Sequence, residues 1–257
     1  MAMPFDVNLY HSLTAIGRLA PRLKWYLTAV VALGALNYPE EIPKLYTLLL
    51  SDHIPKPDQK SETSKMREGL TKVCGIHGAA KTGSALRALA TATPPELADS
   101  TYHRAGDTRE EAIRRGAENY SSIYDNIPGY DSDKTLNASP DYYHIVRGMG
   151  SSSNFWTIFL QYSSIPLVTE LFYGHIFSFT GVLDNLETGQ VVVAALLGID
   201  CHEQARNHML GMLMRGASHE DLVAIRSIVV SLAEHYGVKF KHPSMTIPIL
   251  ETSTVNQ

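Results

Sequence analysis

The 257-residue sequence contains two cysteines, Cys74 and Cys201. Two thiols in a chain of this length cannot build a disulfide scaffold, and they cannot by themselves bind a structural zinc ion. A reducing compartment is therefore the default expectation.

The sequence also lacks an excess of basic residues, because its 22 lysines and arginines face 26 acidic residues and the net charge is −4. It therefore offers no basic stripe that could neutralise nucleic-acid phosphates or anionic lipids. We expect no nucleic-acid partner and no role at a membrane surface.

Long clean apolar runs are missing as well. The cleanest run, residues 25–38, is shorter than the roughly 20 residues that cross a bilayer. Glu170 and His175 interrupt the longer run at residues 165–183.

The N-terminus has no secretory signal pattern, although residues 7–39 are basic and free of acids, which weakly resembles a transit peptide. We expect a cytoplasmic protein without transmembrane helices, and mitochondrial targeting stays open.

The sequence is 44% hydrophobic, and its apolar residues recur at helical spacing in almost every segment. Sustained alternation bounded by hairpin turns is not found, so the pattern predicts an all-α protein. The expected helices cover residues 18–37, 40–51, 62–74, 78–92, 141–149, 152–163, 166–181, 186–198, 201–215 and 219–236, with a further helix capped by Thr108.

A proline-containing connection at residues 92–106 separates two expected helical halves, residues 1–107 and 108–240, followed by a tail at residues 241–257. The segment CGIHGAAKTGSALRAL in the first half parallels LGIDCHEQARNHMLGM in the second. We interpret this similarity as a degenerate internal repeat.

The segment DCHEQARNH carries the main candidate site. Asp200 and Glu203 have the spacing of a capping box, which predicts that a helix begins with Cys201 in its first turn, where the helix dipole favours a thiolate. At helical spacing, Gln204 and His208 share the face of Cys201. Buried polar groups without partners cost about 1 to 3 kcal/mol each, so this face indicates a pocket. The alternative is that these side chains bond to each other or to neighbouring helix ends.

Residues 165–240, and above all LETGQVVVAALLGIDCHEQARNHMLGMLMRGASHEDL, resemble the AhpD-like superfamily. This superfamily contains alkylhydroperoxidase D and γ-carboxymuconolactone decarboxylase. The shared pattern is an apolar helix, a break, a helix with a polar residue four positions before a histidine, and a Gly-Ala-Ser turn. The first half of the chain resembles larger fungal-type members more loosely. The resemblance implies an AhpD-like helical fold.

In the alkylhydroperoxidase branch, the resemblance implies a C-x-x-C pair before the histidine. The first cysteine corresponds to Cys201, but Gln204 stands in place of the second. A dithiol peroxidase needs both thiols. The decarboxylase branch retains the histidine, uses neither metal nor organic cofactor, and transfers protons on small carboxylated or enolisable substrates. This branch fits the sequence better.

We therefore expect a cofactor-independent, carboxymuconolactone decarboxylase-like lyase or isomerase that acts on a small organic metabolite. His208 is expected to shuttle the proton with a pKa near the working pH, Gln204 to orient the substrate, and the Cys201 region to polarise it. Decarboxylation, isomerisation and lactone or ring chemistry stay open. The residues expected to bind the substrate are Tyr173, Met212 and Arg215.

Members of this superfamily self-associate, and the stretch MLGMLM suits a helical interface, so we expect a homo-oligomer.

Metals are not expected, because Arg206 breaks the H-E-x-x-H pattern that His202 begins, and Cys74 with His77 makes a poor metal site. Nucleotide-binding motifs are lacking too. Two other functions stay open, a thiol peroxidase or redox sensor that uses Cys201, and a non-catalytic helical scaffold.

Overall fold

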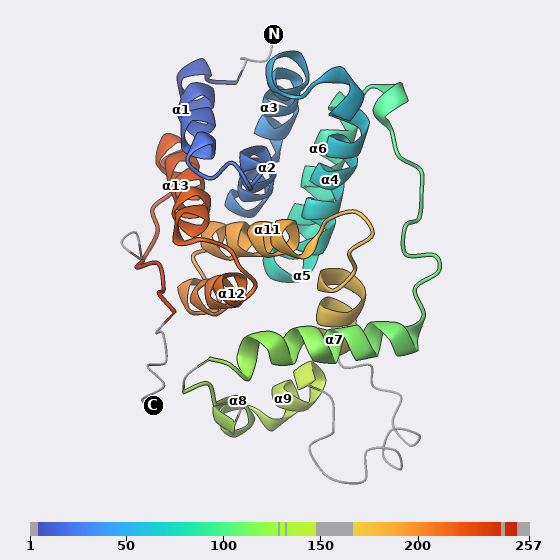
Figure 1. Ribbon diagram of the computed structural model, residues 1–257, viewed down its shortest axis with the longest axis vertical. Coiled ribbons are helices and arrows are strands. Elements are labelled where there is room, and N and C mark those ends of the chain that lie inside the picture. Colours follow the sequence, from blue (N-terminus) through green and yellow to red (C-terminus); the bar gives the residue numbers. More distant parts are fainter. Residues whose placement is uncertain (1–4, 128, 132, 148–166, 243–244, 251–257) are drawn as a thin grey trace, which may run out of the picture. The chain divides into compact units, whose positions relative to one another are not determined.

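The computed structural model describes residues 5–127, 129–131, 133–147, 167–242 and 245–250 (Figure 1). Every regular element in these ranges is helical and none is a strand, so the predicted all-α class is confirmed. The chain divides into two compact units. Unit 1 combines residues 1–101 with residues 182–257, and unit 2 comprises residues 102–181. Unit 1 thus draws on both of the halves expected from the sequence.

Unit 1 contains nine described α-helices, joined by short 3-10 turns and by the π-helical segment η2 (Leu49–His53). The helices are α1 (Val7–Arg18), α2 (Trp25–Leu36), α3 (Ile42–Leu48), α4 (Gln59–Lys72), α5 (Cys74–His77), α6 (Ala79–Ala92), α11 (Asn185–Gly198), α12 (His202–Met214) and α13 (His219–His235).

Helix α2 forms the centre of unit 1. All of its residues are buried, from Trp25 to Leu36, and it packs against α1, α3, α4, α6, α11 and α13. A helix that is apolar on every side must be covered on every side. Asn37 ends it in the left-handed conformation at φ 70°. Within the described ranges, no helix combines the length and the apolar character that crossing a bilayer requires.

Charged side chains cover the N-terminal end of α2. Lys24 forms an ion pair with Glu62 of α4 and lies 3.4 Å from the carboxylate of Glu187 of α11. The Tyr26 hydroxyl donates to the other Glu62 oxygen at 2.7 Å, and the Gln190 amide donates to the Lys24 carbonyl at 2.8 Å. These bonds join three helices that are distant in the sequence.

Unit 2 contains α7 (Arg109–Tyr124), α8 (Asp133–Ala138), α9 (Pro140–Arg147) and the π-helix η5 (Leu167–Phe177). Two glycines allow the backbones of α7 and η5 to touch. A Cβ atom at Gly116 would lie 2.4 Å from the Thr169 carbonyl oxygen, and one at Gly174 would lie 2.6 Å from the Ala112 carbonyl oxygen. Larger residues at this crossing would force the two helices apart.

Several predicted helix boundaries differ from the structure. Residues 7–18 form α1, which was not predicted, and α4 begins at Gln59 rather than after Ser61. Helix α8 occupies a segment for which no helix was predicted. The Thr108 cap is confirmed, because its hydroxyl accepts the Glu111 N–H at 3.3 Å. The helix expected at residues 152–163 lies outside the described residues.

His77 is buried at the end of α5, with its Nε2 atom 3.0 Å from the Thr82 hydroxyl. Burial lowers the pKa of His77 to about 4, and a hydrogen bond with the Gly34 carbonyl opposes this effect only in part. The folded protein therefore holds a neutral imidazole at this position.

The depressed pKa of His77 predicts a loss of stability in acid. Between about pH 6.5 and pH 4 the unfolded chain takes up a proton that the folded chain excludes. The free energy of unfolding therefore falls by up to about 1.4 kcal/mol per pH unit from this one group. In His77→Gln the decline should be shallower, measured by urea unfolding at several pH values. The exposed His219→Gln is the control, and equal slopes in all three proteins would contradict this assignment.

Candidate functional site

The turn before α12 differs from the predicted cap. Cys201 is the N-cap residue of α12, and its side chain makes no capping hydrogen bond. Asp200 lies in the left-handed region at φ 58°, and its carboxylate accepts the Lys241 N–H at 2.6 Å. The predicted capping box of Asp200 and Glu203 is therefore wrong, because Asp200 binds the C-terminal segment instead. Cys201 nonetheless stands at the N-terminal end of the helix, as expected.

Helix α12 combines an apolar side with a polar one. Ala205 and Met209 are buried in the core of unit 1. Gln204 and His208 are half-buried and follow each other by one helical turn, and Arg215 is exposed directly after the helix. An amide, an imidazole and a guanidinium thus follow one another along the same side of α12.

His208 carries no charge at neutral pH. Burial, and to a smaller extent the positive charge of Arg215, lower its pKa to about 4. The prediction that this pKa lies near the working pH is therefore wrong for the free protein. Sequence spacing could not show it, because the shift depends on the packing around the ring.

Met212 is part of the core of unit 1 and packs against α11. A Cβ atom at Gly189 would lie 2.7 Å from Cγ of Met212, so a small residue is needed there. Packing accounts for Met212, and we do not include it in the proposed site.

Met209 and Leu210 are also buried, so most of the stretch MLGMLM is unavailable for the expected interface between subunits. Self-association stays a prediction.

Glu187, at the start of α11, has a structural role. Its carboxylate accepts the Asp184 N–H at 3.1 Å, and the Asp184 side chain accepts the Glu187 N–H at 2.8 Å, which completes a capping box. The same carboxylate pairs with Lys65 of α4. These contacts fix α11 against α4.

Tyr173 belongs to unit 2, in η5. Its side chain is buried among Tyr120, Tyr124 and Phe177, and its hydroxyl donates to the Tyr124 hydroxyl at 3.1 Å. Burial raises the pKa of Tyr173 well above its ordinary value, so the phenol stays protonated. The predicted role of Tyr173 in substrate binding is untested by these contacts.

Unit 2 contains a polar cluster that was not predicted from the sequence. The Asp107 carboxylate accepts Arg115 of α7 at 2.7 Å and lies 3.2 Å from Nδ1 of His175 in η5. The Arg115 guanidinium also donates to the Ser178 hydroxyl at 3.3 Å. These groups are up to 71 residues apart, counted from Asp107 to Ser178, so local sequence patterns gave no signal for them.

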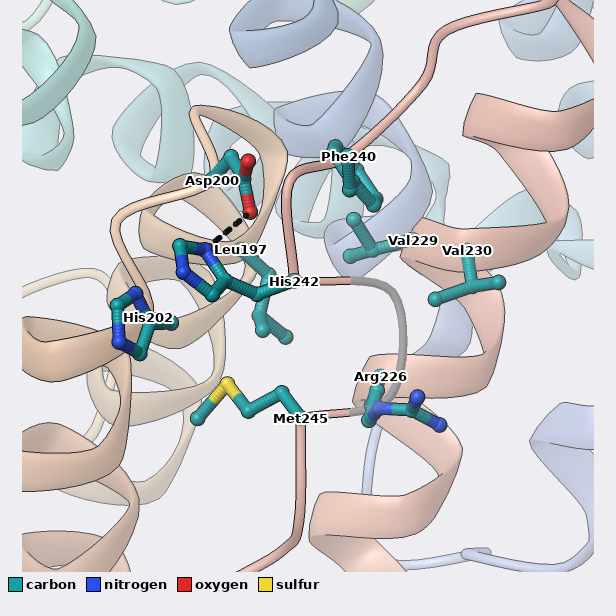
Figure 2. A pocket seen from close by; sticks show the side chains of 9 residues that line it. All are labelled: Leu197, Asp200, His202, Arg226, Val229, Val230, Phe240, His242 and Met245. Atoms are coloured by element: carbon teal, nitrogen blue, oxygen red, sulfur yellow. Dashed lines mark ion pairs between the residues drawn. The ribbon is translucent and has the colours of Figure 1, made fainter.

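A small hollow borders the N-terminal end of α12 (Figure 2). Its volume is about 20 Å³, which is little more than the 10 to 15 Å³ that one water molecule needs. The hollow is therefore too small for a metabolite. The predicted residues Gln204 and His208 do not line it. The lining residues are Leu197, Asp200, His202, Arg226, Val229, Val230, Phe240, His242 and Met245.

Cys74 and Cys201 are both half-buried, and neither forms a disulfide. Among the described residues, no group of three His, Cys, Asp or Glu side chains is placed to hold a metal ion.

The effect of Arg215 on His208 can be measured directly. In Arg215→Gln the pKa of His208 should rise toward its ordinary value of about 6.5, because a positive charge that opposes protonation is removed. Titration of the His208 ring by NMR gives this value. Arg206→Gln, on the exposed part of α12, is the matched control and should leave the titration unchanged. An unchanged His208 titration in Arg215→Gln would contradict the electrostatic coupling.

The fold and the polar face of α12 define an all-helical protein with a neutral histidine beside an arginine. No protein-family model matches the chain, and no solved structure matches it. Two relatives are similar over most of their length, and both carry the name Peroxisomal protein 2. The protein from Schizosaccharomyces pombe is 29% identical over 216 residues, which cover 84% of this chain and 88% of the relative. The protein from Saccharomyces cerevisiae is 24% identical over an alignment that covers 89% of this chain and 95% of the relative.

Proposed function

We propose that the chain is a peroxisomal enzyme without metal or organic cofactor that transfers a proton on a small carboxylic acid at the polar face of α12. The observation that carries this proposal is the neutral imidazole of His208 beside the positive charge of Arg215. The sequence resemblance to the decarboxylase branch of the AhpD-like superfamily supports the same chemistry.

Arg215 gives the site its preference for a carboxylate. A guanidinium binds a carboxylate through two parallel hydrogen bonds. The Gln204 amide, one turn before His208, can donate and accept hydrogen bonds and is suited to orient the rest of the molecule. Cys201 stands at the N-terminal end of α12, where the positive end of the helix dipole favours negative charge.

A bound carboxylate would also activate His208. Its negative charge offsets that of Arg215 and favours the imidazolium, so the pKa of His208 rises when substrate binds. The imidazole then gains a proton at neutral pH in the complex but not in the free protein. In a decarboxylation, the bond to the carboxylate breaks, carbon dioxide leaves, and the imidazolium gives its proton to the enolate carbon. Isomerisation and lactone opening use the same proton transfer.

The proposed enzymatic function is tested with acetoacetate and γ-carboxymuconolactone as probes. We expect the His208 titration to move to higher pH when a probe binds, and carbon dioxide release or isomerisation to follow. His208→Gln should lower turnover by about 100-fold or more, which is typical for loss of a proton-transfer group. Arg206→Gln should retain full turnover.

Two results would overturn this function. One is full turnover by a folded His208→Gln protein, as judged by circular dichroism. The other is the absence of any effect of either acid on His208 or on thermal stability, which would favour the non-catalytic helical scaffold.

The name shared by the two relatives favours a peroxisomal location over the cytoplasmic one expected from composition. We expect fluorescent fusions at either end of the chain, imaged in yeast, to include at least one that coincides with a peroxisomal marker. A diffuse or mitochondrial signal from both fusions would contradict this location.

A further inference from the structure

Arg215 is the C-cap residue of α12, and the turn that follows it is closed by two backbone hydrogen bonds. The Gly216 N–H donates to the Leu213 carbonyl at 3.0 Å. The Ala217 N–H donates to the Met212 carbonyl, also at 3.0 Å. This pair of bonds is a Schellman motif, and Gly216 adopts the left-handed conformation that the motif requires, at φ 87°. The backbone from which the Arg215 side chain projects is therefore set by this turn.

The same turn leads directly into α13. The Ser218 hydroxyl accepts the Asp221 N–H at 3.1 Å, and the Asp221 carboxylate accepts the Ser218 N–H at 2.8 Å, which completes a capping box. Ala217, between the two helices, is buried in the core of unit 1. The turn thus fixes the end of α12 against the start of α13.

Arg22 reaches this turn from a segment 194 residues away in the sequence. Its guanidinium donates to the Gly216 carbonyl at 2.9 Å and lies 3.9 Å from the Asp221 carboxylate. Arg22 belongs to the loop at residues 19–24 between α1 and α2, and its neighbours Ala20 and Leu23 are both buried in the core of unit 1. The loop is held by these two residues, so the Arg22 side chain can restrain the turn.

The bond to the Gly216 carbonyl is the stronger of the two contacts of Arg22. The Arg22 side chain is 56% exposed, and solvent screens an ion pair at 3.9 Å in such a position. A hydrogen bond from a charged donor at 2.9 Å is stronger than one between neutral groups. Loss of this bond would loosen the residue that directly follows Arg215.

We propose that Arg22 is a positioning residue, which fixes the Gly216 turn and thereby holds Arg215 in place to bind the substrate carboxylate. This inference rests on the function proposed for Arg215. It can nonetheless be tested in the free protein, because the positive charge of Arg215 also acts on the ring of His208.

Arg22→Gln tests this role. Once the turn is loosened, Arg215 should act less on His208, so NMR titration of the His208 ring should move to higher pH, although by less than in Arg215→Gln. The dissociation constant of acetoacetate, measured on the same signals, should rise about two- to tenfold, as expected for one lost hydrogen bond. Arg22→Lys keeps a donor for the Gly216 carbonyl and should restore most of both properties. Arg18→Gln removes the same charge from the exposed end of α1 and should leave both unchanged.

A double-mutant cycle separates positioning from the direct effect of the Arg22 charge. If Arg22 acts through Arg215, Arg22→Gln should have no further effect on the His208 titration in a protein that already carries Arg215→Gln. Additive effects of the two substitutions would overturn the proposal, and so would a His208 titration in Arg22→Gln that equals that of the wild type. Failure of the wild type to bind acetoacetate would contradict only the proposed function, because the His208 titration still decides the role of Arg22.

Discussion

The fold of unit 1 depends on the burial of one helix. Helix α2 has no polar side, so the gain from removing it from water is available only when other helices surround it completely. Segments from both ends of the sequence supply that cover, because α1, α4 and α6 come before residue 101 and α11 and α13 come after residue 182. The ion pairs of Lys24 and Glu62 close the N-terminal end, where the backbone would otherwise meet solvent.

The polar side of α12 is a consequence of the same packing. Its apolar residues Ala205, Met209 and Met212 are buried, and this places Gln204 and His208 at the half-buried border of the helix. A histidine held in this way loses its charge because its surroundings solvate an imidazolium less well than water does. Such a residue responds strongly to a bound anion, and this response is the basis of the proposed enzyme.

The sequence predicted the helical class and most of the helices of unit 1, because apolar spacing reports directly which face of a helix is buried. It failed where the outcome depends on distant partners. Asp200 and Glu203 have the spacing of a capping box, but the Asp200 carboxylate accepts the distant Lys241 N–H instead. The clusters around Asp107 and Glu62 join residues that are far apart in the sequence, so no local sequence pattern indicates them. The pKa of His208 was misjudged for the same reason, since burial is a property of the assembled fold. The internal repeat and the AhpD-like arrangement stay predictions.

The central position of α2 also orders the events of synthesis. This helix leaves the ribosome early, whereas α11 and α13, which cover two of its sides, follow only after unit 2 has been made. A strongly apolar segment of twelve residues is thus without its full cover during most of translation. Exposed apolar surface of this kind makes nascent chains prone to aggregation. The tendency of α2 to aggregate therefore persists until α13 has been synthesised and can cover it.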